Sequence, residues 1–320
     1  MSRIERLMAA DRPYLADGGL ETAMIYNEGF DLPQFAAFVL LDTEPGKAAL
    51  RRYFNGFLNL AARAGTGYVL DTPTWRAGSQ WGAVLGLDRD AVRGVNRRAV
   101  DFVREIRDQR QSPDLPVLIN GVIGPSGDGY SVAERLAPAS AQDRHALQVT
   151  ALADAGVDLL TLVTMTHSGE AIGAVRAAVV AGVPVVVSFT VETDGNLPSG
   201  ETLAAAIAAT DAATGAAPLF YMINCAHPSH FKSRLVADIT GRIGAIRANA
   251  SQLSHAELDV ATTLDAGDPD DLGRNYADLL ARLPNLKIVG GCCGTDHRHL
   301  AAIAQYCCAQ PGIDSDAPLP

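Results

Sequence analysis

A chain of 320 residues with 48% hydrophobic and 19% charged residues can bury a large core, which excludes a disordered or low-complexity protein. The net charge of −10 argues against nucleic acid or an anionic membrane as the main partner and favours a small molecule. The sequence shows neither a signal peptide nor an uninterrupted apolar stretch of membrane-spanning length, so we expect a soluble, cytoplasmic protein.

Short apolar runs recur along the chain, and each is bounded by turn residues and followed by a stretch with helical spacing. The runs predict eight strands, at residues 13–19, 67–72, 116–121, 157–164, 184–190, 219–225, 242–249 and 286–291. The clearest intervening segments predict helices at residues 44–65, 88–108, 141–156 and 200–215, and several of them end at a glycine.

This alternation of strand and helix predicts an α/β fold. Eight strands that are apolar on both faces favour a single-domain (β/α)8 TIM barrel. An open Rossmann-like sheet is the alternative, but the segment DGGLET at residues 17–22 has its glycines too close together for the dinucleotide-binding loop. We expect the barrel domain to span residues 1–310 and a C-terminal tail to follow at residues 311–320.

The five cysteines are an odd number clustered late in the chain, unlike a secreted disulfide framework. Cys225 closes the sixth predicted strand, whereas Cys292 and Cys293 follow the eighth. Chemistry in a barrel gathers at the carboxyl ends of the strands, so three thiols can converge there. Zinc prefers such thiolates, and three ligands leave its fourth position open. Flanking glycines supply the backbone freedom that two adjacent ligands need, namely Gly290, Gly291 and Gly294.

The alternative interpretation needs no metal, because a pair of cysteines in a glycine-rich turn can simply be small buried side chains. The presence of Cys225 at another strand end favours the metal site. We interpret Cys307 and Cys308, in the last predicted helix, as packing residues. We do not assign the nearby His297 and His299 to the metal.

Several motifs resemble those of the homocysteine S-methyltransferase family over nearly the whole chain. They are NCxxP at 224–228, GGCCGT at 290–295, DGGxET at 17–22, GxxGPxG at 121–127, AGVDLL at 155–160, and Asn249. The resemblance implies a zinc ion held by Cys225, Cys292 and Cys293, which would activate the acceptor thiol. It implies methyl transfer from a small sulfonium, S-methylmethionine or S-adenosylmethionine, to homocysteine, giving methionine.

The resemblance also implies substrate-binding residues. Asp17 and Gly18 would position the acceptor, and Asn224 and Asn249 would line the pocket. For Asp17, a cap or turn residue before the first helix is an equally good interpretation.

Two positions depart from the family pattern. Val163 stands where the family usually has a glutamate that binds the amino group of homocysteine, and Ala36 stands where many members have tryptophan. Acids that would compensate for the first departure are Glu170, Glu192 and Asp194. Aromatic residues that would compensate for the second are Phe35, Phe38, Trp75 and Trp81, of which Trp75 is our preferred surface for a cationic donor.

These departures keep other functions open. The same chemistry could serve a betaine-type donor or a different thiol acceptor. A noncatalytic relative that binds zinc or a ligand is the alternative from another class.

Overall fold

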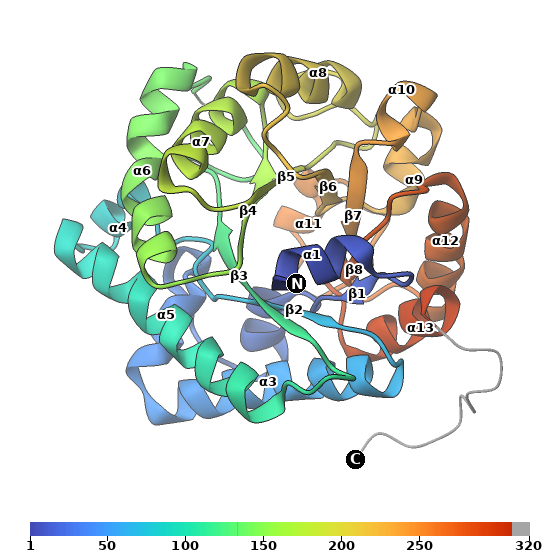
Figure 1. The fold of residues 1–320 in the computed structure, drawn as a ribbon, viewed down its shortest axis with the longest axis horizontal. Coiled ribbons are helices and arrows are strands. Elements are labelled where there is room, and N and C mark those ends of the chain that lie inside the picture. Colours follow the sequence, from blue (N-terminus) through green and yellow to red (C-terminus); the bar gives the residue numbers. More distant parts are fainter. Residues whose placement is uncertain (133, 309–320) are drawn as a thin grey trace.

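The computed structural model describes residues 1–132 and 134–308, so the expected tail at 311–320 lies outside the described residues. Within that range, eight parallel strands close into a barrel in sequence order, because β1 pairs with both β2 and β8 (Figure 1). This closure confirms the TIM barrel and excludes the open sheet. The strands are β1 (Tyr14–Leu15), β2 (Tyr68–Asp71), β3 (Val117–Ile123), β4 (Leu159–Met165), β5 (Val185–Phe189), β6 (Tyr221–Asn224), β7 (Ile243–Ala248) and β8 (Ile288–Gly291).

Helices surround the barrel (Figure 1). The longer ones are α3 (Glu44–Arg63), α5 (Arg89–Arg110), α6 (Pro138–Asp154), α7 (Ser168–Ala181), α8 (Leu203–Thr214), α12 (Pro269–Arg282) and α13 (His297–Cys307). The short ones are α1 (Arg3–Ala9), α2 (Leu20–Thr22), α4 (Ser79–Val84), α9 (Pro228–Phe231), α10 (Ala237–Thr240) and α11 (His255–Asp259). Tighter or wider turns form η1 (Ala23–Asn27), η2 (Pro33–Phe35), η3 (Ala37–Asp42) and η4 (Lys232–Arg234).

End residues explain where two of the predicted helices begin or end. The Asp88 side chain accepts a hydrogen bond from the Ala91 amide at 2.8 Å and so begins α5. Gly215 ends α8 in the left-handed region with φ 64°, which a glycine adopts without steric cost. The first strand, Tyr14–Leu15, is much shorter than the predicted run at 13–19. Hydrogen bonds to β8 nevertheless continue beyond it, because the Ala16 amide donates to the Val289 carbonyl at 2.9 Å and the Asp17 carbonyl accepts from the Gly291 amide at 2.8 Å.

The interior of the barrel changes from apolar to polar along the strands. A buried cluster of inward-facing residues that includes Leu118, Leu159 and Met222 also contains Leu7 of α1, so this helix covers the amino-terminal opening (Figure 1). Further along the same strands, the alternation places Asn120, Thr161 and Asn224 inside, all of them buried. The polar end of the interior is therefore the carboxyl end, where barrel chemistry occurs.

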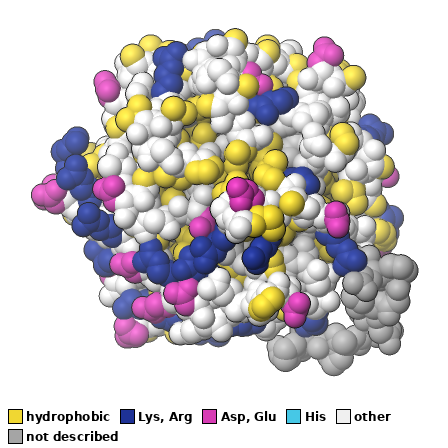
Figure 2. All heavy atoms as spheres, in the orientation of Figure 1, with side chains coloured by type: hydrophobic (Ala, Val, Ile, Leu, Met, Phe, Trp, Pro, Cys, Tyr) yellow, Lys and Arg dark blue, Asp and Glu magenta, His cyan; other side chains and the backbone are white. Residues whose placement is uncertain are grey.

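The outer faces of the strands pack against the helices in one large hydrophobic cluster. On the face shown in Figure 2, basic and acidic side chains alternate along α5, where ion pairs join Arg51 to Glu105 and Arg104 to Asp101. No helix in the described ranges has both the length and the apolar character needed to cross a bilayer.

Candidate active site

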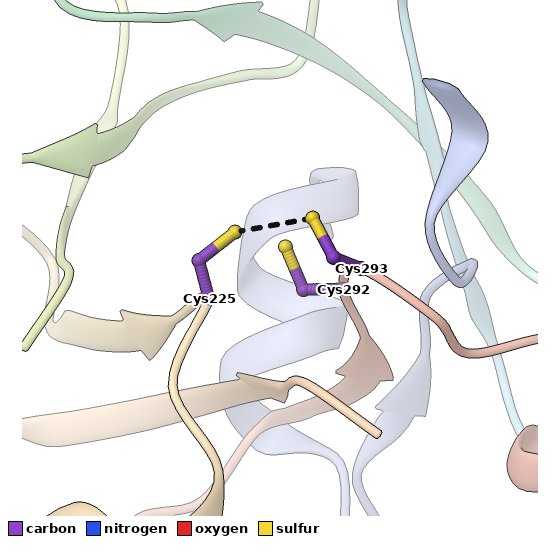
Figure 3. Close-up of side chains that lie close together, drawn as sticks. All are labelled: Cys225, Cys292 and Cys293. Atoms are coloured by element: carbon purple, nitrogen blue, oxygen red, sulfur yellow. Dashed lines mark hydrogen bonds between the residues drawn. The ribbon is translucent and has the colours of Figure 1, made fainter. Parts of the chain in front are cut away.

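Three cysteines from two strand ends converge at the carboxyl rim. Cys225 follows β6, and Cys292 and Cys293 follow β8. Their sulfur atoms all lie within 4.8 Å of one another, and Cys225 Sγ is 3.9 Å from Cys293 Sγ (Figure 3). The convergence expected from the sequence is therefore present.

The backbone around the cysteines is held in unusual conformations. Cys225 has φ 53°, a left-handed value that is uncommon for a residue other than glycine. Gly294 has φ 78°, so it supplies the turn that the sequence analysis expected of the flanking glycines. Gly291 is needed for space instead, because a Cβ there would meet the Thr295 side chain at 2.0 Å. Thr295 Oγ1 donates to the Cys292 carbonyl at 2.7 Å and holds the turn closed.

Asn224 connects the cysteines to the barrel interior. Its Oδ1 accepts hydrogen bonds from the Thr164 amide at 3.0 Å and from Ser188 Oγ at 2.5 Å. Its Nδ2 donates to Thr164 Oγ1 at 2.9 Å and faces Cys292 Sγ at 3.9 Å. The amide is fixed on both sides, so it presents an N–H group to one sulfur in a set orientation.

Two aromatic side chains cover the other side of the cluster. The Tyr130 hydroxyl lies 3.6 Å from Cys225 Sγ and 3.7 Å from Cys293 Sγ. The His255 ring is tilted against Tyr130 with 4.5 Å between ring centroids, and its Nε2 donates to the Cys225 carbonyl at 2.6 Å. His255 Nδ1 is in turn 3.2 Å from Glu192 Oε1. Glu192 therefore contacts the histidine that binds the backbone of Cys225.

The donor set fits a tetrahedral metal ion. Zinc–sulfur bonds of about 2.3 Å at tetrahedral angles place sulfur atoms about 3.8 Å apart, which is close to the 3.9 Å between the sulfur atoms of Cys225 and Cys293. Hydrogen bonds from Cys292 and Cys293 lower the pKa of Cys225 well below its usual range, whereas the bond to Cys225 raises the pKa of Cys292 to about 12. The protein alone therefore favours one thiolate in the cluster, and a cation is needed to stabilise three.

A cavity of about 230 Å³ opens beside the three sulfur atoms. Of the substrate-binding residues expected from the sequence, four line it, namely Asp17, Gly18, Trp75 and Asn224. Asn249 does not appear among the described lining residues. It is buried, and its backbone N–H donates to the Ala226 carbonyl at 3.1 Å. A direct contact between Asn249 and a substrate stays a prediction.

Asp17 is part of a buried ion network at the polar end of the barrel. Its carboxylate pairs with Arg247, which also pairs with Asp71. Asn120 Nδ2 donates to Asp71 at 2.7 Å, and Thr161 Oγ1 donates to Asn120 at 2.8 Å. Burial raises the pKa of Asp17 to about 7, against the opposing effect of Arg247.

Asp17 is not a helix cap, because the cap residue before α2 is Gly19 and no side chain caps this helix. The network therefore joins Asp17, after β1, to strands β2, β3, β4 and β7 across the inside of the barrel.

The acids expected to replace the family glutamate lie elsewhere. Val163 lines the pocket, but none of the three candidates is among the described lining residues. Glu170 is buried and accepts hydrogen bonds from His145 at 2.9 Å and from the Ser126 amide at 2.7 Å. Asp194 accepts bonds from Asn196 on the surface, and Glu192 supports His255 as described above.

The pocket carries two arginines to which the sequence analysis gave no role, Arg76 and Arg247. Four acids besides Asp17 also line it, namely Glu21, Asp71, Asp128 and Asp259. Arg247 had a visible signal, since it is a charge inside an otherwise apolar strand. Arg76 directly follows Trp75 at the end of the second strand–loop segment, which was a weaker signal. Tyr130, which also lines the pocket, gave no local signal because it comes from a loop far from the cysteines in sequence.

The aromatic candidates have different surroundings. Trp75 and Trp81 both line the pocket, but each already stacks on the Arg76 guanidinium, whose Cζ is 3.9 Å and 3.8 Å from their ring centroids. Phe35 also lines the pocket and is 49% exposed. Phe38 is buried in a small cluster with Ala36. Phe35 is therefore the aromatic side chain with the more accessible ring.

Comparison with known proteins places the chain in a family. The family model described as homocysteine S-methyltransferase matches residues 14–307. A methionine synthase of Mycobacterium leprae is 27% identical over 227 residues, which cover 67% of this chain and 18% of the relative. A methionine synthase of Mycobacterium tuberculosis is 26% identical over the same shares. The chain thus spans less than a fifth of the length of these curated relatives.

Solved structures agree in fold. The oxidized form of the homocysteine methyltransferase MmuM from Escherichia coli superposes with a TM-score of 0.75 at 20% identity, covering 95% of this chain and 99% of that one. Its metallated form superposes with a TM-score of 0.71 at 21% identity and the same coverage. Because the family model spans nearly all described strands and helices, the chain belongs to the homocysteine S-methyltransferase family.

Proposed function

We propose that this protein transfers a methyl group from a small sulfonium donor to the sulfur of a thiol acceptor, with a zinc ion held by Cys225, Cys292 and Cys293. The observation that carries the proposal is the trio of sulfur atoms within 4.8 Å beside a cavity of about 230 Å³. The cavity is large enough for small molecules, and its polar lining belongs to the carboxyl end of the barrel.

The bound metal would supply one property, a lowered pKa of the acceptor thiol, while three anionic ligands keep the acceptor sulfur electron-rich. The acceptor sulfur then forms a bond to the methyl carbon as the bond from that carbon to the donor sulfur breaks. The electron pair of the broken bond stays on the donor, which leaves as a neutral thioether. No general base is needed in this step, because the acceptor proton is lost beforehand.

The residues of this chain position the groups rather than exchange protons. Asn224 orients Cys292, and Tyr130 covers the sulfur atoms of Cys225 and Cys293. Asp17 and Gly18 form part of the wall in which the acceptor would sit. Such fixed polar groups contribute to rate by holding reactants in line.

Homocysteine is the acceptor implied by the family, with S-methylmethionine or S-adenosylmethionine as donor and methionine as product. The test is to incubate the zinc-loaded protein with a panel of thiols against sulfonium and betaine-type donors, and to identify products by mass. Methylated thiol that depends on both donor and metal supports the proposal. No turnover with any pair would overturn it in favour of a binding protein.

A cationic donor should contact an aromatic ring. The pocket offers a tryptophan that is stacked on Arg76 and a phenylalanine whose ring is more accessible. We expect Trp75 to form a wall of the donor site, although one side of its ring is stacked on Arg76. Phe35 presents a more accessible ring, and a cation over such a ring gains about 0.5–2 kcal/mol. Phe35→Leu should therefore raise the donor KM several-fold and more than Trp75→Leu does, with metal content unchanged. Equal donor KM in both variants and the parent protein would remove the aromatic contact from the proposal.

A further inference from the structure

Arg76 is a buried cation in the pocket wall with few partners. It is 4% exposed, and among the residues that the structure describes it forms no ion pair. Its Nη1 donates to the Gly127 carbonyl at 3.0 Å, whereas its Nε finds no acceptor in the described part of the chain. A buried guanidinium with unsatisfied donors is costly, so an anionic ligand would stabilise it.

Two indole rings pack against the guanidinium group of Arg76. Its Cζ lies 3.9 Å from the Trp75 ring centroid and 3.8 Å from that of Trp81. Trp81 is itself anchored, because its Nε1 donates to the Pro125 carbonyl at 3.0 Å. Two aromatic rings thus pack against the guanidinium, which leaves its N–H groups as the polar contact for a ligand. A planar carboxylate matches two of these N–H groups.

The neighbouring acids do not neutralise Arg76 as they neutralise Arg247. Asp128 contributes to the local field, but its Oδ1 accepts hydrogen bonds from the amides of Tyr130 at 2.8 Å and Ser131 at 2.9 Å, which commits it to the loop. Burial raises the pKa of Glu21 to about 7. Burial also lowers the pKa of Arg76 to about 10, so the guanidinium stays charged at neutral pH.

The same pocket lacks an acid at the position where the family usually binds an ammonium group. Val163 lines the wall there, and Glu170, Glu192 and Asp194 are outside the described lining residues. The wall is apolar at this position. The acids that do line the pocket are Asp17 and Asp71, which pair with Arg247, and Glu21, Asp128 and Asp259. None of them forms an ion pair with Arg76 among the described residues, so this cation is suited to an anionic ligand.

We propose that Arg76 binds the carboxylate of a methyl-transfer substrate, so that the pocket selects a carboxylate-bearing thiol or sulfonium without requiring its amino group. The inference rests on the proposed function for the identity of the reaction. The carboxylate contact itself depends only on Arg76, Trp75 and Trp81, and it can be measured without turnover.

The first test uses four thiols that share one three-carbon chain: homocysteine, 4-mercaptobutanoate, 3-aminopropanethiol and propanethiol. Trp75 and Trp81 are the two tryptophans of the chain, so intrinsic fluorescence reports on both sides of the Arg76 site. We expect the two carboxylates to bind the zinc-loaded protein about tenfold or more tightly than the other two thiols. Butanoate, which has no thiol, should quench or shift the fluorescence of the metal-free protein as well. Equal affinity for all four thiols would overturn the proposal.

The second test uses variants. Arg76→Gln should remove the preference for carboxylates while retaining the affinity for propanethiol, and Arg76→Lys should restore part of the preference because it keeps the charge but not the planar fork. Arg93→Gln, on the exposed side of α5, is the matched control and should behave as the parent protein does. A carboxylate preference that survives in Arg76→Gln would refute the assignment. If that variant does not fold by circular dichroism, the thiol series on the parent protein decides.

Matched sulfoniums, (3-carboxypropyl)dimethylsulfonium and propyldimethylsulfonium, separate the two sources of the carboxylate. A KM preference confined to the thiols assigns it to the acceptor, and one confined to the sulfoniums assigns it to the donor. A preference in neither series overturns the inference. Carboxylate-dependent fluorescence that is lost in Arg76→Gln, without any methyl transfer, would support the inference while the proposed function fails.

Discussion

Two pairs of adjacent cysteines in this protein have the same dipeptide sequence and different surroundings. Cys292 and Cys293 follow a barrel strand, line the pocket and share hydrogen bonds with Cys225. Cys307 and Cys308, at the end of α13, are buried in the large hydrophobic cluster. The difference teaches that a cysteine pair becomes a candidate metal site through its position at a strand end and through a third thiol from a distant strand.

The polar surroundings differ as much as the positions do. Asn224 and Tyr130 direct polar groups at the pocket cysteines. Around the helical pair, the described contacts are apolar apart from the bond that Cys308 Sγ donates to the Pro13 carbonyl at 3.6 Å. Four experiments test this contrast, and they run from the largest expected effect to the smallest.

The largest effect should come from removing a proposed ligand. Cys225→Ser, Cys292→Ser and Cys293→Ser should each lose most of the bound zinc and the methyl transfer, because the remaining pair of thiolates binds zinc far more weakly. Metal content per chain, measured by inductively coupled plasma mass spectrometry, checks this. Cys307→Ser is the matched control and should retain both metal and activity. Unchanged zinc in Cys225→Ser would disprove the site as drawn.

A smaller loss should follow from changing the amide that orients Cys292. Asn224→Asp keeps the size and can still accept hydrogen bonds, but it adds a negative charge and removes the N–H group that faces the sulfur at 3.9 Å. We expect zinc affinity to fall about 10–100-fold, as is common when a group behind a metal ligand is replaced. Competition with a chromogenic chelator measures it. Asn285→Asp, on the exposed surface, should leave the affinity unchanged.

The two cysteine pairs should also differ in reactivity toward iodoacetamide. In the metal-free protein, hydrogen bonds from its neighbours lower the pKa of Cys225, whereas burial raises the pKa of Cys307 and Cys308 to about 12. Because the thiolate is the reactive form, Cys225 should be labelled about tenfold or more faster than Cys307 or Cys308 at neutral pH. Peptide mass mapping resolves the sites, and zinc should protect the cluster alone. Equal labelling of Cys307 would contradict the contrast.

The smallest effect concerns stability at high pH. The thiols of Cys307 and Cys308 stay protonated up to about pH 12 when folded, against a usual pKa of 9.0, because burial disfavours the thiolate. Between these values the folded state binds more protons than the unfolded state, so the stability due to these thiols falls as pH rises above 9.

At pH 10 the parent protein should have lost roughly 1 kcal/mol per thiol relative to the double variant Cys307→Ala/Cys308→Ala, compared with the same difference at pH 7. Urea unfolding at several pH values measures this difference. Parallel curves for the two proteins would mean that the thiols are not the titrating groups.

The sequence sufficed for the barrel and the three cysteines for clear physical reasons. Buried parallel strands produce short apolar runs, and each run here became a strand of the closed barrel. The carboxyl ends of such strands share one rim, so cysteines at the ends of β6 and β8 had to approach each other.

The remaining parts of the site depend on loop paths that no local pattern encodes. Tyr130 contacts the sulfur atoms from the loop after β3. Arg76 is stacked on a second indole because Trp81 of α4 lies next to it. None of the three acids expected to replace the family glutamate is among the described lining residues, and Glu170, for example, pairs with His145. The nearness of an acid to a strand end in the sequence did not predict whether its side chain lines the pocket.

Cys225 also sets a limit on how this protein can change under selection. Its φ of 53° costs on the order of 1–2 kcal/mol for a residue with a side chain, and glycine would adopt it freely. Glycine at position 225 would also raise the conformational entropy of the unfolded chain by a similar amount, and it would remove a buried side chain and the third thiol. We therefore expect selection for heat tolerance in the presence of zinc to keep the cysteine, so that the strained backbone persists because of the metal site.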